Sequence, residues 1–278
     1  MRNHIVVGTD GSPTAALAVE WAADEAERAR MPLVIVHVVE PDGRPSRGSR
    51  ELEVDSRSTL ESAARFARKR AALVTISTVE ATGRPASALA SHASGARMLV
   101  VGNRGLGAVA GALLGSVSRQ LASHAPCPLV VVRFQQTPEA AGVVLGISGD
   151  PGEEPVLEFA LQEAERHEGL LRAIHTWHRP AAREPGDMLP LVYDVEGVQE
   201  QERVLLGEVM GGAREAFPDV TIDEHCARGR ASNALVDASE HASLVVVGAR
   251  HGALPILSPT TSAVLHRAHC PVAVVGHG

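Results

Sequence analysis

The sequence predicts an α/β protein made of two similar domains, each a five-stranded parallel sheet with helices on both faces. Three observations lead to this prediction. The chain contains an internal repeat, short β-branched runs alternate with amphipathic segments, and glycine-rich turns follow the apolar runs. Strands that are apolar almost throughout and are separated by helical patterns indicate a parallel sheet, because only helical crossovers readily join parallel strands.

The repeat covers nearly the whole chain. Three pairs of segments match in order: 6–39 with 144–177, 74–102 with 220–248, and 127–132 with 270–275. The offsets between the copies are 138, 146 and 143 residues. The second copy therefore gains eight residues between its second and third strands and loses three in the segment that matches a glycine-rich stretch. We place the domain boundary at 135/136, within a short linker around Pro138.

The elements of the first copy follow one another as strand, helix, strand. The expected strands are 4–9, 33–39, 73–80, 98–102 and 128–133, and the expected helices are 13–30, 51–70, 85–94 and 116–124. Ser12 and Pro13 are typical of the N-cap and first position of a helix, and Pro85 after "GR" marks the third helix in the same way. The second copy repeats this order.

Composition excludes several functional classes. The 278 residues are 45% hydrophobic and 21% charged, and 26 basic against 33 acidic residues give a net charge of −7. Without a basic run interleaved with aromatic residues, neither nucleic acid nor a membrane is an expected partner. Three scattered cysteines fit reduced thiols, and no apolar run reaches the length of a membrane span, so we expect a cytoplasmic protein.

A dense glycine cluster follows the fourth strand of the first copy, in "VVGNRGLGAVAGALLGSVS" at 100–118. In a doubly wound sheet, ligands bind beyond the carboxyl ends of the strands, where neighbouring connections diverge. Asp10 and Gly11 after the first strand would face Gly102 and Gly105 there. Glycines let a backbone approach a ligand closely, and a helix that begins at Ser116 would direct free N–H groups at an anion.

The spacing Gly102-x-x-Gly105-x(9)-Gly115-Ser116, with "VGTDGS" upstream, resembles the ATP-binding signature of universal stress proteins. The resemblance covers both halves, as in tandem members of that family. It implies two Rossmann-like domains of the universal stress protein type: 1–135 with a nucleotide site and 136–278 with a degenerate one.

The resemblance also implies which residues bind the nucleotide. Asp10 and Val38 match positions that hold adenine, and the ribose and phosphate positions are matched by Gly102, Gly105, Gly115, Ser116 and Val117. We add Arg104, whose cation could meet a phosphate, and Ser118. The expected cofactor is ATP with Mg²⁺. No catalytic residues are predicted, so we expect a nucleotide-binding stress-response regulator with at most slow hydrolysis.

Other interpretations of these residues remain open. Taken singly, Asp10 could cap a turn and Ser116 could be only an N-cap. "GLGAVA" at 105–110 satisfies G-x-G-x-x-A, which would suit an NAD-dependent oxidoreductase, although it follows the wrong strand. A ligand-free interaction scaffold is the other alternative.

Two groups of histidines invite further interpretation. His37 and His175 occupy equivalent places in the two copies, which favours a structural role. "HRAHC", with His266, His269 and Cys270, suggests zinc, but no second ligand pair accompanies it, and cations at a helix end are the commoner explanation.

The second copy has lost much of the signature. Ser148 replaces Asp10, and Asp150, Glu153 and Glu154 add negative charge nearby. In its loop, His251 replaces Gly105, and Ser258-Pro259 replaces Gly115-Ser116. We therefore predict that only the N-terminal domain binds ATP; Arg250 and His251 could recruit a different anion in the second copy.

The fifth strands are expected to lie at the sheet edges, where unpaired apolar strands are a liability. The resemblance implies that such edges pair across a two-fold axis, so Leu129–Val132 should face Val272–Val275 within one chain. Further pairing of chains into a homodimer is also possible.

Overall fold

The computed structural model describes residues 4–40, 56–106, 114–133, 141–177, 194–250 and 257–277. The strands are β1 (Ile5–Gly8), β2 (Leu33–Val39), β3 (Ile76–Thr82), β4 (Met98–Gly102), β5 (Leu129–Val132), β6 (Val143–Gly146), β7 (Leu170–Trp177), β8 (Thr221–Arg228), β9 (Leu244–Arg250) and β10 (Val272–His277). The helices are α1 (Pro13–Ala29), α2 (Ser56–Arg70), α3 (Pro85–His92), α4 (Ser116–His124), α5 (Glu154–Arg166), α6 (Val195–Ala216), α7 (Ala231–Ala238) and α8 (Pro259–Arg267). None of the helices in these ranges is long and apolar enough to cross a membrane.

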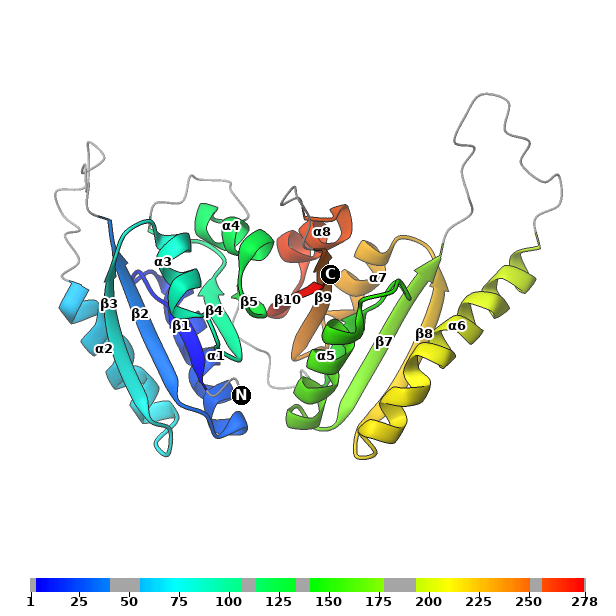
Figure 1. Cartoon of the computed structure of the whole chain (residues 1–278), viewed down its shortest axis with the longest axis horizontal. Coiled ribbons are helices and arrows are strands. Elements are labelled where there is room, and N and C mark those ends of the chain that lie inside the picture. The colour runs from blue at the N-terminus through cyan, green and yellow to red at the C-terminus, as the bar shows by residue number, and fades with distance from the viewer. Residues whose placement is uncertain are drawn as a thin grey trace, which may run out of the picture.

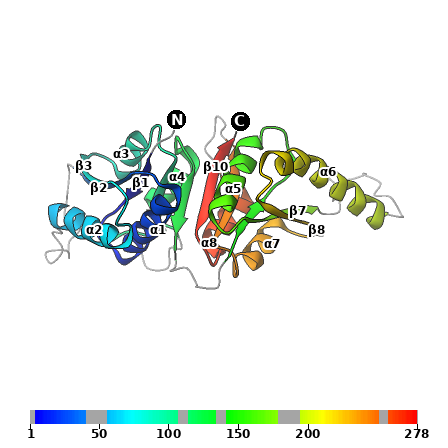
Figure 2. The same cartoon turned by 90° about the horizontal axis from the view of Figure 1, so that it is seen from below.

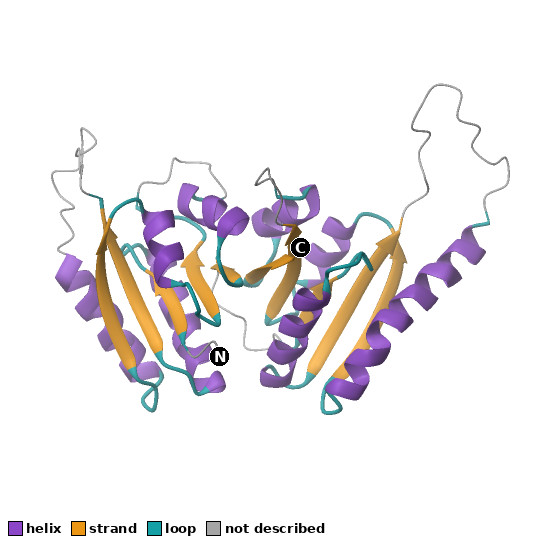
Figure 3. Cartoon of the chain, viewed as in Figure 1, coloured by secondary structure: helices purple, strands orange, loops and turns teal. Residues whose placement is uncertain are grey.

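All ten strands form one sheet in the order β3-β2-β1-β4-β5-β10-β9-β6-β7-β8 (Figures 1 and 3). Neighbouring strands within each half are parallel. The two halves have the same internal order, and they meet at the centre through β5 and β10. The predicted α/β fold with two parallel five-stranded units is confirmed.

Helices cover both faces of the sheet (Figure 2). One apolar cluster packs α1, α2, α5 and α6 against one face, and a second packs α3, α4, α7 and α8 against the other. The central strands are therefore buried on both sides: Val6 and Val7, which point to opposite faces, are each 0% exposed. This burial explains why these strands are apolar throughout rather than alternating.

Local signals in the sequence place most helix starts. The Ser12 side chain accepts a hydrogen bond from the Ala15 N–H at 3.2 Å, and Pro13 begins α1. Helix α3 begins at Pro85, as predicted. Of the expected helix 51–70, only the part from Ser56 onward lies within the described residues.

The third strand was predicted two to three residues too early. Helix α2 ends at Arg70 and is followed by a turn in which the Val74 N–H donates to the Ala71 carbonyl at 3.2 Å. This turn leaves Leu73 93% exposed, and β3 begins only at Ile76. The apolar run 73–80 was misleading because its first residues belong to the turn.

The fifth strands pair with each other within the chain. Strands β5 and β10 are antiparallel, with Val272 opposite Val131, Ala273 opposite Val130, and Val274 opposite Leu129. The expected intramolecular pairing is therefore present, and the two apolar edges are buried at the middle of the sheet instead of being exposed.

We expect the amides of β5 and β10 to exchange with solvent much more slowly than those of the outer strands β3 and β8, because the central pair has neighbours on both sides. Hydrogen exchange followed by mass spectrometry on the native chain would measure this. Rapid exchange in β5 and β10 would contradict the pairing.

Candidate functional site

A pocket of about 500 Å³ lies at the carboxyl ends of β1 and β4, bordered by β2, α1, α3 and α4. All nine residues predicted for the site line it: Asp10, Val38, Gly102, Arg104, Gly105, Gly115, Ser116, Val117 and Ser118. Residues from three separate segments of the chain, which were predicted to form one site, therefore line the same pocket. Residues 107–113 of the glycine-rich loop lie outside the described part of the chain.

Asp10 ties the turn after β1 to the loop after β4. One carboxylate oxygen accepts the Ser12 N–H at 3.0 Å, and the other accepts the Leu106 N–H at 2.8 Å. The first bond is a local turn contact of the kind Asp commonly makes. The second spans the pocket, so Asp10 also fixes where the glycine-rich loop begins.

Close contacts surround two glycines of the site. A Cβ atom on Gly102 would lie 2.8 Å from the backbone carbonyl atoms of Thr14, so β4 and the start of α1 fit together only with glycine at 102. A Cβ atom on Gly105 would lie 2.4 Å from Asp10 Oδ2, so a side chain there would force the Asp10 carboxylate to move.

The N-terminus of α4 faces the pocket. Its N-cap residue, Gly115, has no side chain to bond the first N–H groups of the helix, and Ser116, Val117 and Ser118 supply these groups. The free N–H groups and the helix dipole make this end favourable for an anion. The Ser118 hydroxyl, however, donates to the Gly102 carbonyl at 2.8 Å, so its role in this structure is to join α4 to β4.

The pocket has an apolar side and a charged rim. Val36, Val38, Leu89 and Val101 form the apolar side. Charged residues at the rim are Glu40, Arg104 and Arg119. Burial, and to a smaller extent the nearby Arg104 cation, lower the pKa of Arg133, which lies just after β5. Arg133 does not line the pocket, and its guanidinium donates to the Leu265 carbonyl on α8 at 3.3 Å.

The two equivalent histidines have structural partners. His37 Nδ1 lies 2.8 Å from the Thr9 carbonyl oxygen, and His175 Nδ1 lies 3.1 Å from that of Ile147. The same ring atom joins the second strand of each half to the residue after the first strand. This repetition agrees with the predicted structural role.

In the C-terminal half, the N–H groups of the turn after β6 are already bonded to a side chain of the protein. A carboxylate oxygen of Glu153 accepts the N–H groups of Ser148 and Gly149, each at 3.0 Å. Arg250, at the end of β9, forms an ion pair with Asp150. The two turn amides and the Arg250 guanidinium, which could attract an anion, are thus already paired with acidic side chains. His251 lies outside the described residues.

The hydrogen bond that joins the helix after the loop to the preceding strand, in contrast, is present in both halves. Thr261 donates to the Gly248 carbonyl at 2.9 Å, as Ser118 does to Gly102, and Ser258 caps α8 by accepting the Thr261 N–H at 3.0 Å. The second copy has therefore kept the contacts that hold its fold.

In the part of the chain that the structure describes, the His and Cys side chains of the "HRAHC" segment belong to no cluster of three potential metal ligands. His269 Nε2 lies 3.9 Å from a Glu240 oxygen, and burial raises the pKa of the Cys270 thiol to about 12, which keeps it protonated. Among the described residues, one group of potential ligands does lie together, namely Glu25, Glu163 and His167, whose ligand atoms are within 4.8 Å of one another. The sequence pattern predicts no role for these three residues, although the repeat aligns Glu25 with Glu163.

The model of the universal stress protein family matches residues 1–133 and 142–276. A universal stress protein of Mycobacterium tuberculosis, Rv2005c, is 32% identical over 98% of this chain and 97% of its own length. Another from the same organism, Rv2623, is 33% identical over 88% of this chain and 86% of its own length.

Solved structures show the same fold. A universal stress protein from Archaeoglobus fulgidus superposes with a TM-score of 0.69, at 18% identity over the full length of both chains. A putative universal stress protein from Pseudomonas aeruginosa gives a TM-score of 0.67 at 16% identity, covering all of this chain and 94% of the other.

The contact between Gly102 and α1 leads to a prediction about stability. Gly102→Ala should lower the free energy of unfolding by about 1–3 kcal/mol, because the new methyl group would press on the backbone of Thr14. Gly211→Ala is the control: this glycine lies in the exposed interior of α6 with open space around it, and alanine there should stabilise by about 0.5–1 kcal/mol. Urea unfolding would compare the two, and equal effects would contradict the packing argument.

Proposed function

The chain belongs to the universal stress protein family, and we propose that it binds ATP, together with Mg²⁺, through its N-terminal domain and acts as a nucleotide-dependent stress-response regulator. The proposal rests on the pocket beyond β1 and β4, where an uncapped helix N-terminus, glycine-rich backbone and an apolar wall meet. A pocket of about 500 Å³ falls within the usual size range of small-molecule sites.

The phosphates would bind at the N-terminus of α4. The N–H groups of Ser116 and Val117 are donors there, and Gly105 and Gly115 leave the backbone accessible. Arg104 and Arg119 at the rim add positive charge. Mg²⁺ is commonly held by phosphate oxygens and one or two carboxylates, and Glu40 is the carboxylate of the described lining that the adenine does not use.

The adenine ring would lie against the apolar side of the pocket, at Val38 and its neighbours Val36 and Val101. Asp10 already accepts two backbone N–H groups. An ionised carboxylate has about four lone-pair positions, so Asp10 can accept a further bond from the adenine amino group without losing the contacts that shape the loop.

The alternatives have less support. A dinucleotide fingerprint should follow the first strand of its unit and lead directly into a helix, whereas 105–110 follows β4, and α4 begins only at Ser116. A ligand-free scaffold would not need the uncapped N-terminus of α4 to line an open pocket. We assign no catalytic residue, and slow hydrolysis is compatible with the proposal.

We propose domain limits of 1–135 and 136–278. The last strand of the first half ends at Val132 and the first strand of the second half begins at Val143, so the boundary falls between them. The three cysteines are free thiols, and we propose a reducing, cytoplasmic location.

Gly115→Val tests the phosphate site. A branched side chain at the N-cap of α4 would occupy space in front of the helix N–H groups, so ATP affinity should fall at least about tenfold, which corresponds to about 1.4 kcal/mol. Calorimetric titration with ATP and Mg²⁺ would measure affinity, and circular dichroism would check that the fold is intact. A wild-type thermal shift with NAD and none with ATP would instead favour the oxidoreductase.

The degenerate second half predicts one ATP per chain. Glu153 already occupies the turn where a ligand would meet Ser148 and Gly149, and it would repel phosphates. Titration of the wild type should give a stoichiometry close to one, and Asp10→Ala should lose nearly all binding. Ser148→Ala, the same kind of change in the other half, should bind normally. Two sites per chain, or full binding by Asp10→Ala, would show that the second pocket is active.

A further inference from the structure

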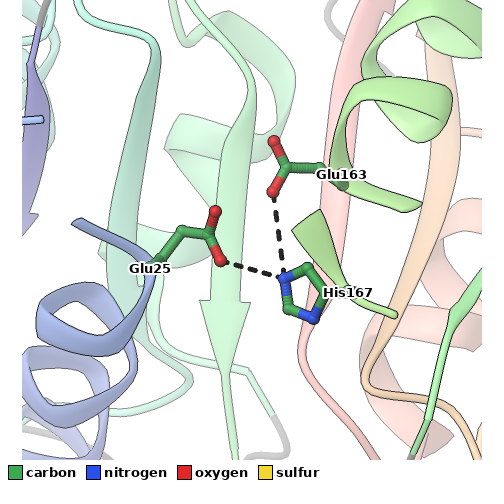
Figure 4. A group of neighbouring side chains, drawn as sticks. All are labelled: Glu25, Glu163 and His167. Carbon is green, nitrogen blue, oxygen red and sulfur yellow. Dashed lines mark hydrogen bonds and ion pairs between the residues drawn. The ribbon is translucent and has the colours of Figure 1, made fainter. Parts of the chain in front are cut away.

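Two buried glutamates meet where the two domains join. Glu25 lies on α1 and Glu163 lies at the equivalent place on α5, 138 residues later. Both are 0% exposed. Figure 4 shows them pointing toward each other from the two domains, with His167 beside them. The antiparallel pairing of β5 and β10 relates the two halves and so brings like residues together.

Each glutamate is paired with a side chain of the other domain. His167 Nε2, from the C-terminal domain, lies 2.9 Å from Glu25 Oε2 and 4.0 Å from Glu163 Oε2. Arg97, from the N-terminal domain, forms an ion pair with Glu163 and also donates to Gln162 at 3.0 Å. These contacts cross the junction in both directions.

Two further charged residues, Arg28 and Arg166, occupy equivalent positions in the two halves and are more exposed than the glutamates. Arg28 lies 3.1 Å from Glu25, and Arg166 lies 3.6 Å from Glu163, each from the same helix as its partner. Their side chains are 34% and 23% exposed, so water screens them. The buried part of the cluster is therefore Glu25, Glu163, Arg97 and His167.

A charge count shows what this buried part lacks. Among the buried groups alone, with both carboxylates ionised and a neutral imidazole, the Arg97 cation leaves one negative charge, which only the partly exposed Arg28 and Arg166 offset; such a charge is costly in a dry interior. One further proton makes the group neutral. Two buried oxygens without a hydrogen-bond partner, Glu25 Oε1 and Glu163 Oε2, belong to these same carboxylates. A proton held between the carboxyl groups would supply both the missing charge and the missing hydrogen bond.

We propose that Glu25 and Glu163 share one proton and that this proton locks the two domains together, so that the junction weakens as the pH rises. The lock is a feature of the domain junction and does not depend on the proposed nucleotide site.

The direction of the pKa shift of Glu163 agrees with a proton held by this pair of carboxyl groups. Burial first, and then the Glu25 carboxylate, raise the pKa of Glu163 to about 8, although Arg97 opposes this. Burial alone would raise the pKa of Glu25, but its contact with His167, and to a smaller extent with Arg28, holds that pKa below its usual value. The pair thus keeps one proton at neutral pH. Because the folded chain holds this proton more tightly than the unfolded chain, its stabilising effect is full below about pH 4.5 and is lost as the pH rises toward 8.

A metal ion fits the cluster less well. The three potential ligands lie close enough together. A divalent cation, however, would add charge beside the three guanidinium groups of Arg28, Arg97 and Arg166. The 2.9 Å contact between His167 and Glu25 is already a normal hydrogen-bond distance.

Glu163→Gln tests the shared proton. A glutamine has nearly the same shape, and its amide can donate permanently to Glu25 where the proton would lie. Urea unfolding of the full chain should be compared between wild type and variant from pH 5 to pH 9. The unfolding constant of the wild type should rise relative to the variant by about tenfold per pH unit between about pH 5 and 7.5, and the ratio should level off above about pH 8. A ratio that does not change with pH would overturn the proposal.

Glu165→Gln is the matched control. It makes the same chemical change on the same helix, at an exposed position two residues away. Its unfolding constant should follow the wild type across the pH range. If it instead reproduced the behaviour of Glu163→Gln, the effect would come from general charge and not from the buried pair.

Two measurements on the wild type keep the proposal testable if the variant fails to fold. Infrared spectroscopy at pH 7 should show a protonated carboxyl band that disappears above about pH 8. Amide exchange in β5 and β10, corrected for its intrinsic pH dependence, should accelerate over the same range. No such band, no acceleration, or a metal bound in equal amount to the protein at these residues would each overturn the proposal.

Discussion

The antiparallel pairing of β5 with β10 is the constraint on which the rest of the structure depends. It joins two parallel five-stranded units into one sheet and buries the two edges that each unit would otherwise expose. Because the pairing relates the halves by an approximate two-fold rotation, it also decides which helices meet at the centre. Helices α1 and α5 come together on one face, where Glu25 and Glu163 meet. One backbone ladder therefore sets the domain junction.

Much of this arrangement was predictable from the sequence because it depends on local patterns and on the repeat. Apolar runs gave the strands, Ser12-Pro13 and Pro85 gave helix starts, and the glycine spacing brought Asp10 and Gly105 to one pocket. The start of β3 was wrong because exposed Leu73 looks like a strand residue when its solvent contact is unknown. Hydrogen bonds that cross the pocket, such as Leu106 to Asp10, were also invisible in the sequence.

The buried cluster at the junction was missed for a different reason. The repeat aligned Glu25 with Glu163, but an alignment does not show that aligned residues touch. Arg97 and His167 have no equivalents in the other half: Ser243 and Ala29 occupy those positions. The repeat therefore could not predict that Arg97 and His167 are the partners of the two glutamates. Only the pairing across the junction shows that Arg97 belongs with Glu163 and His167 with Glu25.

A chain built from two copies of one domain faces a general electrostatic difficulty. Any charged residue near the axis meets its own counterpart, so a single glutamate in the ancestral unit becomes a pair of like charges at the junction. In a buried setting such a pair must lose symmetry, hold a proton, or gain a counter-charge. This chain does so by divergence: Arg97 compensates one carboxylate and His167 contacts the other. The same loss of symmetry appears at the pockets, where Glu153 satisfies in one half the amides of Ser148 and Gly149. At the junction the two glutamates are identical, and the copies differ instead in the residues that contact them, Arg97 against Ser243 and His167 against Ala29.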